Sequence, residues 1–198
     1  TPLRIEYIKN CVGALSELTV LDVGCGGGLT AEPLTRLGAK VTGLDAEKNT
    51  IEIAKTHAEA MELDITYLNK SIEEHAESGV LYDVVLALEI IEHVDNVQLF
   101  CEHLKSMLKP GGTLILSTMN RTAMSYAKAI LAAEYVLRWV PRGTHDWDKF
   151  MKPSEMVNHF EKLGLKLHSM QGLGYNPLTR NWRFTDDLSV NYFACFRR

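Results

Sequence analysis

The sequence has no long hydrophobic run and no disulfide framework. Its longest unbroken apolar stretch is five residues, as at 84–88, whereas a helix that spans a bilayer needs roughly 20. Its four cysteines have no CxxC spacing, and we expect reduced thiols, with Cys101 and Cys195 packed in the core. These absences exclude a helix that spans a bilayer and a small disulfide-stapled scaffold.

A surplus of basic charge is also missing. The 198 residues carry 21 Lys and Arg against 25 Asp and Glu, a net charge of −4, which argues against a nucleic-acid partner. The charge is uneven, because residues 121–152 are +3 and the rest of the chain is −7. A hydrophobic content of 46% is enough for a core. The length predicts one domain, residues 1–198, with the basic stretch as an insertion in it.

Strand and helix patterns alternate through the first 120 residues. Short apolar runs predict strands at 19–23, 40–44, 65–68, 82–88 and 113–118, and helical spacing predicts helices at 29–37, 47–61 and 97–108. The run at 82–88 is apolar on both faces, as in a central parallel strand. This alternation predicts an α/β fold with a doubly wound, mostly parallel sheet, whose ligand lies at the carboxyl ends of the strands.

The last third of the chain departs from this alternation. After a helical insertion at 121–152, residues 153–163 predict one more helix. Residues 165–170 and 188–196 predict two strands with a loop between them. We therefore expect the parallel sheet to be closed by a late antiparallel strand pair.

A glycine-rich loop, LDVGCGGG at 21–28, lies where the first strand should turn into a helix. Glycines let a backbone turn sharply and approach a ligand closely. Asp45 follows Gly24 by 21 residues, at the end of the second strand, where a carboxylate can accept both hydroxyls of an adenosine ribose. The G-x-G-x-x-G pattern of nicotinamide enzymes fails, because Leu29 occupies its sixth position. The loop predicts an adenosine cofactor and disfavours an oxidoreductase.

Glu89, Glu92 and His93 follow the buried strand at 82–88. On a helical turn, these positions share one face. Two carboxylates and an imidazole suit Mg²⁺, Mn²⁺ or Zn²⁺. Two alternatives stay open: a solvated helix start with acids near its N-terminal dipole, and His93 as the general base of a metal-free site.

Several motifs together resemble a known family. LDVGCGGG, TGLD and LKPGG resemble class I S-adenosylmethionine-dependent methyltransferases, which have a Rossmann-like fold. TPLRIEYI, EIIEHV, STMNRT, AEYVLRWVPRGTHDWDKF and GLGYNP, in this order, resemble the ubiquinone-biosynthesis O-methyltransferases. The resemblance implies S-adenosylmethionine as cofactor and O-methylation of polyprenyl hydroxybenzenes or demethylubiquinol. It also implies that one enzyme serves both O-methylation steps.

The resemblance also implies roles for individual residues. Arg4 would hold the methionine carboxylate, which a guanidinium grips in a bidentate manner; the alternative is a surface arginine on an N-terminal helix. The remaining cofactor contacts would be Gly24 and Gly26 in the loop, Asp45 at the ribose and Leu88 at the pocket wall. The metal, most simply Mg²⁺, would be held by Glu89, Glu92 and His93, which would form the catalytic cluster.

The insertion at 121–152 mixes Trp139 and aliphatic residues with basic ones such as Arg138. Such a helix can lie in the interface of an anionic membrane, and the alternative is an ordinary cover over the site. His145 and Asp146 are a weaker candidate for a base and its orienting partner, and Asn120 a weaker candidate for the substrate rim.

The resemblance further implies a location and partners. We expect the bacterial cytoplasm, peripheral to the inner membrane, or alternatively the matrix side of the mitochondrial inner membrane, and membership of a ubiquinone-biosynthesis complex. Two other functions stay open: methylation of a soluble small phenol, and a non-catalytic cofactor-binding scaffold of a membrane complex.

Overall fold

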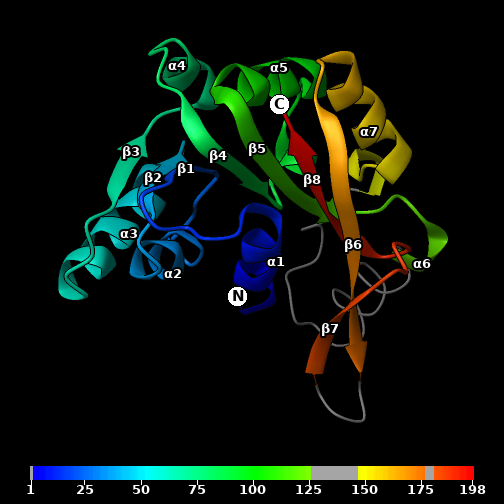
Figure 1. Ribbon diagram of the computed structural model, residues 1–198, viewed down its shortest axis with the longest axis horizontal. Coiled ribbons are helices and arrows are strands. Elements are labelled where there is room, and N and C mark those ends of the chain that lie inside the picture. The colour runs from blue at the N-terminus through cyan, green and yellow to red at the C-terminus, as the bar shows by residue number, and fades with distance from the viewer. Residues whose placement is uncertain (1, 126–146, 177–180) are drawn as a thin grey trace.

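The computed structural model describes residues 2–125, 147–176 and 181–198. Its centre is one eight-stranded sheet with the strand order β3-β2-β1-β4-β5-β8-β6-β7 (Figure 1). Most of the predicted insertion at 121–152, together with His145 and Asp146, lies outside the described residues. No helix in the described ranges combines the length and the hydropathy needed to cross a membrane.

The first five strands are parallel and the last three are antiparallel to their neighbours. They are β1 (Thr19–Val23), β2 (Lys40–Asp45), β3 (Thr66–Asn69), β4 (Tyr82–Leu88), β5 (Leu108–Met119), β6 (Lys166–Asn176), β7 (Asn181–Thr185) and β8 (Asn191–Arg197). This topology confirms the predicted doubly wound fold.

Helices cover both faces of the sheet. One core cluster packs α1 (Pro2–Val12), α2 (Ala31–Arg36) and α3 (Lys48–Ala60) against it. The other packs α4 (Ile72–Ala76), α5 (Val97–Ser106) and α7 (Pro153–Lys162) against the opposite face. Three short turns complete the described elements: η1 (Ile91–His93), α6 (Ala123–Ser125) and η3 (Trp147–Lys149).

Strand β4 shows why the sheet needs both layers. Successive side chains of a strand point to opposite faces. Val84 and Leu86 therefore join the cluster under α1, α2 and α3, whereas Val85 and Ala87 join the cluster under α5 and α7. All four are at most 1% exposed. The continuous apolar run of this strand is thus explained by burial on both sides, as predicted.

The boundary between α5 and β5 differs from the sequence-based expectation. Helix α5 ends at Ser106, not at Leu108, and β5 begins at Leu108 instead of residue 113. The reason is that Leu108 is fully buried and pairs with Tyr82 at the start of β4. The Pro-Gly-Gly at 110–112 therefore lies inside the strand.

The expected loop between the two late strands instead contains a hairpin. Strand β6 runs on to Asn176, and β7 returns beside it, so the late antiparallel section has three strands where two were predicted. Strand β7 was missed because its residues are exposed or half-buried at the edge of the sheet, and it carries no continuous apolar run.

Candidate functional site

The carboxyl ends of β1, β2, β4 and β5 meet at one edge of the sheet. The chain order reverses between β1 and β4, which is the point where ligands bind in sheets of this kind. A cavity of about 540 Å³ lies there, and its lining includes Gly24, Asp45 and His93. This edge is the candidate functional site.

The glycine loop is shaped by close contacts as well as by backbone angles. Gly24 has a φ of +70°, and a Cβ at this position would collide with Ile90 Cδ1. Gly28 has a φ of +85°, and its Cβ would collide with the hydroxyl of Tyr67. Since L-residues rarely adopt these angles, the loop depends on glycine at both positions.

Asp45 is fixed by the loop that it faces. Its Oδ2 accepts a hydrogen bond from the backbone N–H of Gly26 at 2.9 Å, and its Oδ1 accepts one from the backbone N–H of Glu47 at 2.9 Å. Each carboxylate oxygen keeps a further lone pair. The carboxylate is therefore held at the cavity with acceptor capacity left for a ligand's hydroxyls.

Asp22 is a candidate that the sequence analysis missed. It lies in β1, is 3% exposed, and its Oδ2 has no hydrogen-bond partner within the described residues. Burial raises the pKa of this carboxyl to about 7, while the charge of Arg4 opposes the rise and that of Asp45 adds to it. A charged residue in the otherwise uncharged strand TVLDV was the available signal.

Arg4 and Leu88 lie at the same edge but outside the lining of the cavity. Arg4 is half-buried on α1, close enough to Asp22 to lower its pKa. Leu88, the last residue of β4, is 8% exposed and packs in the cluster under α1, α2 and α3. Their contacts with a cofactor stay predictions.

The structure brings Glu89 and Glu92 together. The hydroxyl of Ser117 donates to Glu89 Oε1 at 2.6 Å, and that of Thr118 donates to Glu92 Oε2 at 2.9 Å. Burial, and then the charge of Glu89, raises the pKa of Glu92 to about 7. Glu92 is 7% exposed. Two carboxylates thus share one site at the end of β4 and β5.

His93 has different surroundings from this carboxylate pair. It is exposed and lines the cavity beside Asp45. Across the three described ranges, no group of three His, Cys, Asp or Glu side chains is arranged to hold a metal ion. The carboxylate pair alone offers the hard oxygen donors and negative charge that suit Mg²⁺ or Mn²⁺. The predicted three-residue metal set therefore stays a prediction.

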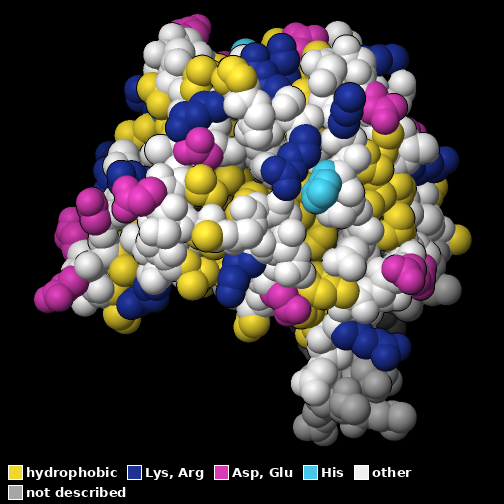
Figure 2. Space-filling model, viewed as in Figure 1, with side chains coloured by type: hydrophobic (Ala, Val, Ile, Leu, Met, Phe, Trp, Pro, Cys, Tyr) yellow, Lys and Arg dark blue, Asp and Glu magenta, His cyan; other side chains and the backbone are white. Residues whose placement is uncertain are grey.

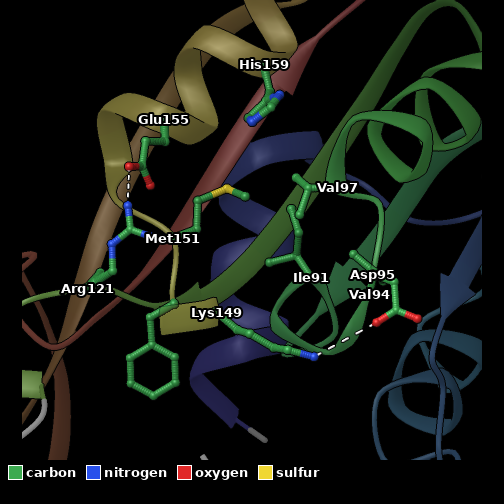
Figure 3. Close-up of a pocket in the computed structure, with 10 residues that line it drawn as sticks. Ile91, Val94, Asp95, Val97, Arg121, Lys149, Met151, Glu155 and His159 are labelled. Carbon is green, nitrogen blue, oxygen red and sulfur yellow. Dashed lines mark hydrogen bonds and ion pairs between the residues drawn. The ribbon is translucent and has the colours of Figure 1, made fainter. Parts of the chain in front are cut away.

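A second cavity of about 490 Å³ lies across η1 from the first, and Val94 and Asp95 line both. Figure 3 shows an Arg121–Glu155 ion pair on one side and Lys149 reaching toward Asp95 on the other, at 4.0 Å. Between them lie apolar side chains: Ile91, Val94, Val97 and Met151. The combination of apolar wall and charged rim suits an amphipathic molecule.

Asn120 lies just past β5, as expected. Its Nδ2 donates a hydrogen bond to the carbonyl oxygen of Leu188 at 2.8 Å. Its backbone N–H donates one to the carbonyl oxygen of Val190 at 2.9 Å. Its Oδ1 is buried and has no partner within the described parts of the chain. The side chain ties the end of β5 to the segment that precedes β8, and its proposed contact with substrate stays a prediction.

Solved structures share this fold across the whole chain. A magnesium protoporphyrin IX methyltransferase from Synechocystis with bound SAH matches with a TM-score of 0.69 at 19% identity, over 100% of this chain and 80% of that one. A structure from echinomycin biosynthesis, described as converting a disulfide bond into a thioacetal group, matches with a TM-score of 0.73 at 22% identity. The match covers 100% of this chain and 81% of that one. At these identities the likeness shows the fold alone.

Sequence comparison defines the class and then the family. The family described as "Methyltransferase domain" matches residues 6–170, so the chain is a methyltransferase of the S-adenosylmethionine-dependent class. The ubiquinone biosynthesis O-methyltransferase of Rickettsia akari is 47% identical over 98% of this chain and 79% of its own length. The ubiquinone biosynthesis O-methyltransferase of Alkalilimnicola ehrlichii is 45% identical over 99% of this chain and 80% of its own length. The chain belongs to the family of ubiquinone biosynthesis O-methyltransferases, as its motifs indicated.

Proposed function

We propose that this enzyme transfers the methyl group of S-adenosylmethionine to a phenolic oxygen of a polyprenyl hydroxybenzene or demethylubiquinol in ubiquinone biosynthesis. The names of its relatives support the substrate class. The observation that carries the cofactor assignment is the buried Oδ2 of Asp22, which has no hydrogen-bond partner among the described residues and lies near the charge of Arg4.

The carboxylate of Asp22 and the guanidinium of Arg4 lie near each other, and together they suit the ammonium and carboxylate groups at the amino-acid end of S-adenosylmethionine. Arg4 would hold the carboxylate of the cofactor, and Asp22 would accept from its ammonium group, since each buried charge needs an opposite partner. Asp45 would bind the ribose hydroxyls from the position that Gly26 and Glu47 fix. These three side chains would orient the cofactor over the glycine loop.

The acceptor oxygen needs to lose its proton. A phenol has a pKa near 10, so at pH 7 only about one molecule in a thousand is the better nucleophile, the phenolate. The proposed role of Glu89 and Glu92 is to hold a divalent cation, which when bound lowers the pKa of a phenol. Ser117 and Thr118 fix the two carboxylates. His93, at the cavity wall, is the alternative proton acceptor.

The function is tested with purified protein, S-adenosylmethionine and a catechol acceptor with and without a prenyl tail. We expect a product heavier by one methylene, with S-adenosylhomocysteine formed in equal amount, and a higher kcat/KM for the tailed acceptor. Equal kcat/KM values favour a soluble phenol as substrate. Cofactor binding without turnover of any acceptor contradicts the proposal and favours a scaffold.

The cation is tested separately from activity. After treatment with a chelator, we expect Mg²⁺ to raise the melting temperature of the wild type and to leave that of the Glu89→Gln/Glu92→Gln variant unchanged, because binding to the folded state stabilises it. Glu59→Gln, at an exposed acid on α3, is the control. Full activity after chelation, with no thermal response to Mg²⁺ or Mn²⁺, would count against the cation.

A tailed substrate resides in a bilayer, so the proposal includes peripheral contact with a membrane. The bacterial inner membrane, reached from the cytoplasm, is the proposed location, and the mitochondrial matrix side is the alternative. Membership of a biosynthetic complex is proposed on the same ground. For the 121–152 insertion, Arg138→Ala with Trp139→Ala should weaken flotation with anionic liposomes, and unchanged flotation would contradict its role.

A further inference from the structure

The β6–β7 hairpin projects beyond the body of the protein at the edge where the parallel strands end (Figure 1). Strand β8 is antiparallel to both β5 and β6, so β6 runs in the same direction as β5. The end of β6 therefore points away from the sheet on the side of the glycine loop and the carboxylate pair. The functional site and the hairpin face the same way.

Two aromatic side chains are exposed near the end of this hairpin. Tyr175 and Trp182 are directly paired across β6 and β7, and they are 45% and 54% exposed. Their ring centroids lie 5.2 Å apart with an interplanar angle of 49°. Cross-strand contact holds the two rings together. Tyrosine and tryptophan with an apolar body and a polar handle suit the boundary between lipid and water.

The charged residues nearest to these rings in the sequence are basic, and the first acids, Asp186 and Asp187, lie beyond the end of β7. Residues 175–183 contain two arginines, Arg180 and Arg183, and no acidic residue, within a chain of net charge −4. Arg183 is exposed on β7. Figure 2 shows a dark-blue basic patch on the projection, with a magenta acidic patch closer to the body of the protein. Local positive charge on an acidic protein complements an anionic lipid surface.

We propose that the β6–β7 hairpin docks into the headgroup region of an anionic bilayer through Tyr175, Trp182 and Arg183. The rings would lie at the headgroup level and the guanidinium would meet lipid phosphates. The catalytic edge would then face the membrane, from which a tailed acceptor can reach the site directly. The inference rests on the proposed function, because an acceptor with a lipid tail is the reason for the catalytic edge to face the membrane.

Binding to vesicles of phosphatidylglycerol and phosphatidylcholine is the test. We expect Tyr175→Ser/Trp182→Ser to weaken sedimentation with the vesicles by about tenfold or more, because two interfacial aromatics are lost. Arg183→Gln should weaken it about fivefold at low salt and less at high salt. The controls are Ile53→Ser and Lys55→Gln, at exposed positions of α3, which should bind as the wild type does.

A second measurement does not depend on how well the serine variant folds. Brominated lipids quench tryptophans that enter the bilayer, and the difference between the wild type and Trp182→Phe reports on Trp182 alone. We expect the quenching to fall in Trp182→Phe. Unchanged quenching, together with vesicle binding that survives Tyr175→Ser/Trp182→Ser, would overturn the proposal. A concentration-dependent dimer that these variants abolish, with no vesicle binding, would overturn it in favour of a second copy of the chain.

Turnover of a tail-less catechol separates the two proposals. If the wild type and the hairpin variants methylate it equally well, the functional site is intact in the variants. A change in vesicle binding then reports on the hairpin alone. If no acceptor is methylated but the hairpin variants lose vesicle binding, the docking surface stands and the proposed function fails.

Discussion

Two buried acids at the functional edge, Asp22 and Glu92, have carboxyl groups whose pKa is raised to about 7. In both, burial is the main cause, and a neighbouring carboxylate adds to it. Apolar surroundings disfavour the charged form unless an opposite charge is near. Such groups are poised for a cationic partner, which is the property expected of a site that binds a sulfonium cofactor with a free ammonium group.

The titration of Asp22 gives the first prediction. Folding raises its pKa from 3.8 to about 7, so the folded state binds more protons between these values. Its contribution to the free energy of unfolding therefore falls as pH rises from about 4 to about 7, by on the order of 4 kcal/mol, and is constant above that. Asp22→Asn should remove this dependence and weaken S-adenosylhomocysteine binding. Urea unfolding and calorimetry across this pH range measure both effects, and an unchanged pH profile would contradict the assignment.

The glycine loop allows a matched pair of substitutions. Gly24→Ala introduces a Cβ against Ile90 at a φ of +70°, and we expect a loss of about 1–3 kcal/mol of stability and weaker cofactor binding. At Gly27 a Cβ would meet no atom within 4 Å, and φ is not positive, so Gly27→Ala should leave stability nearly unchanged. Thermal unfolding and equilibrium dialysis with S-adenosylhomocysteine compare the two. Equal losses would show that contact with Ile90 is not what selects glycine.

At the scale of elements, one side-chain network joins the starts of three strands. Asp83 Oδ2 on β4 accepts from the hydroxyl of Thr19 on β1 at 2.6 Å and from Lys109 Nζ on β5 at 2.9 Å. Lys109 and then Thr19 lower the pKa of Asp83 to about 2. The network lies at the edge opposite the functional site, so its role is to align the strands.

This network predicts an acid-sensitive contribution to stability. Because the folded pKa is depressed, the contribution is present above about pH 4 and is lost as pH falls toward 2. Asp83→Asn should lower the free energy of unfolding by about 1–2 kcal/mol at pH 7 and by little at pH 2. Glu17→Gln, which breaks an exposed ion pair with Lys40, should cost much less, because solvent and salt screen an exposed pair. Denaturant unfolding at both pH values measures the difference, and an equal cost at pH 7 and pH 2 would contradict it.

The elements that could be predicted from the sequence are those with a strong local pattern. Strand β4 was predicted with its observed bounds because six of its seven residues are buried and five of them, 84–88, make a continuous apolar run. Strand β7 could not be predicted, because it owes its place to pairing with β6 and not to its own burial. The site followed the same rule: Gly24 and Asp45 were visible from their spacing, whereas the significance of Asp22 depends on a three-dimensional environment.

At the scale of the whole molecule, cofactor binding should stabilise the fold. The two core clusters meet at a sheet whose functional edge carries a buried carboxylate oxygen, Asp22 Oδ2, without a hydrogen-bond partner among the described residues. S-adenosylhomocysteine at about 100 times its Kd should add about 2.7 kcal/mol, which raises the melting temperature by about 5–10 °C in a chain of this size. NAD⁺ should have no effect, and Asp45→Asn should reduce the shift. No shift at millimolar S-adenosylhomocysteine would contradict the cofactor assignment.

The position of β8 has a consequence for how the chain is made. On the ribosome, β1 to β5 emerge first, and they can pair as a parallel unit. Strands β6 and β7 emerge next and can form their hairpin, but β6 meets β5 only through β8, which is synthesised after both. Until β8 inserts, the apolar edges of β5 and β6 stay open to pairing with other chains. The nascent protein should therefore depend most on chaperones in the interval before β8 has left the ribosome and inserted between β5 and β6.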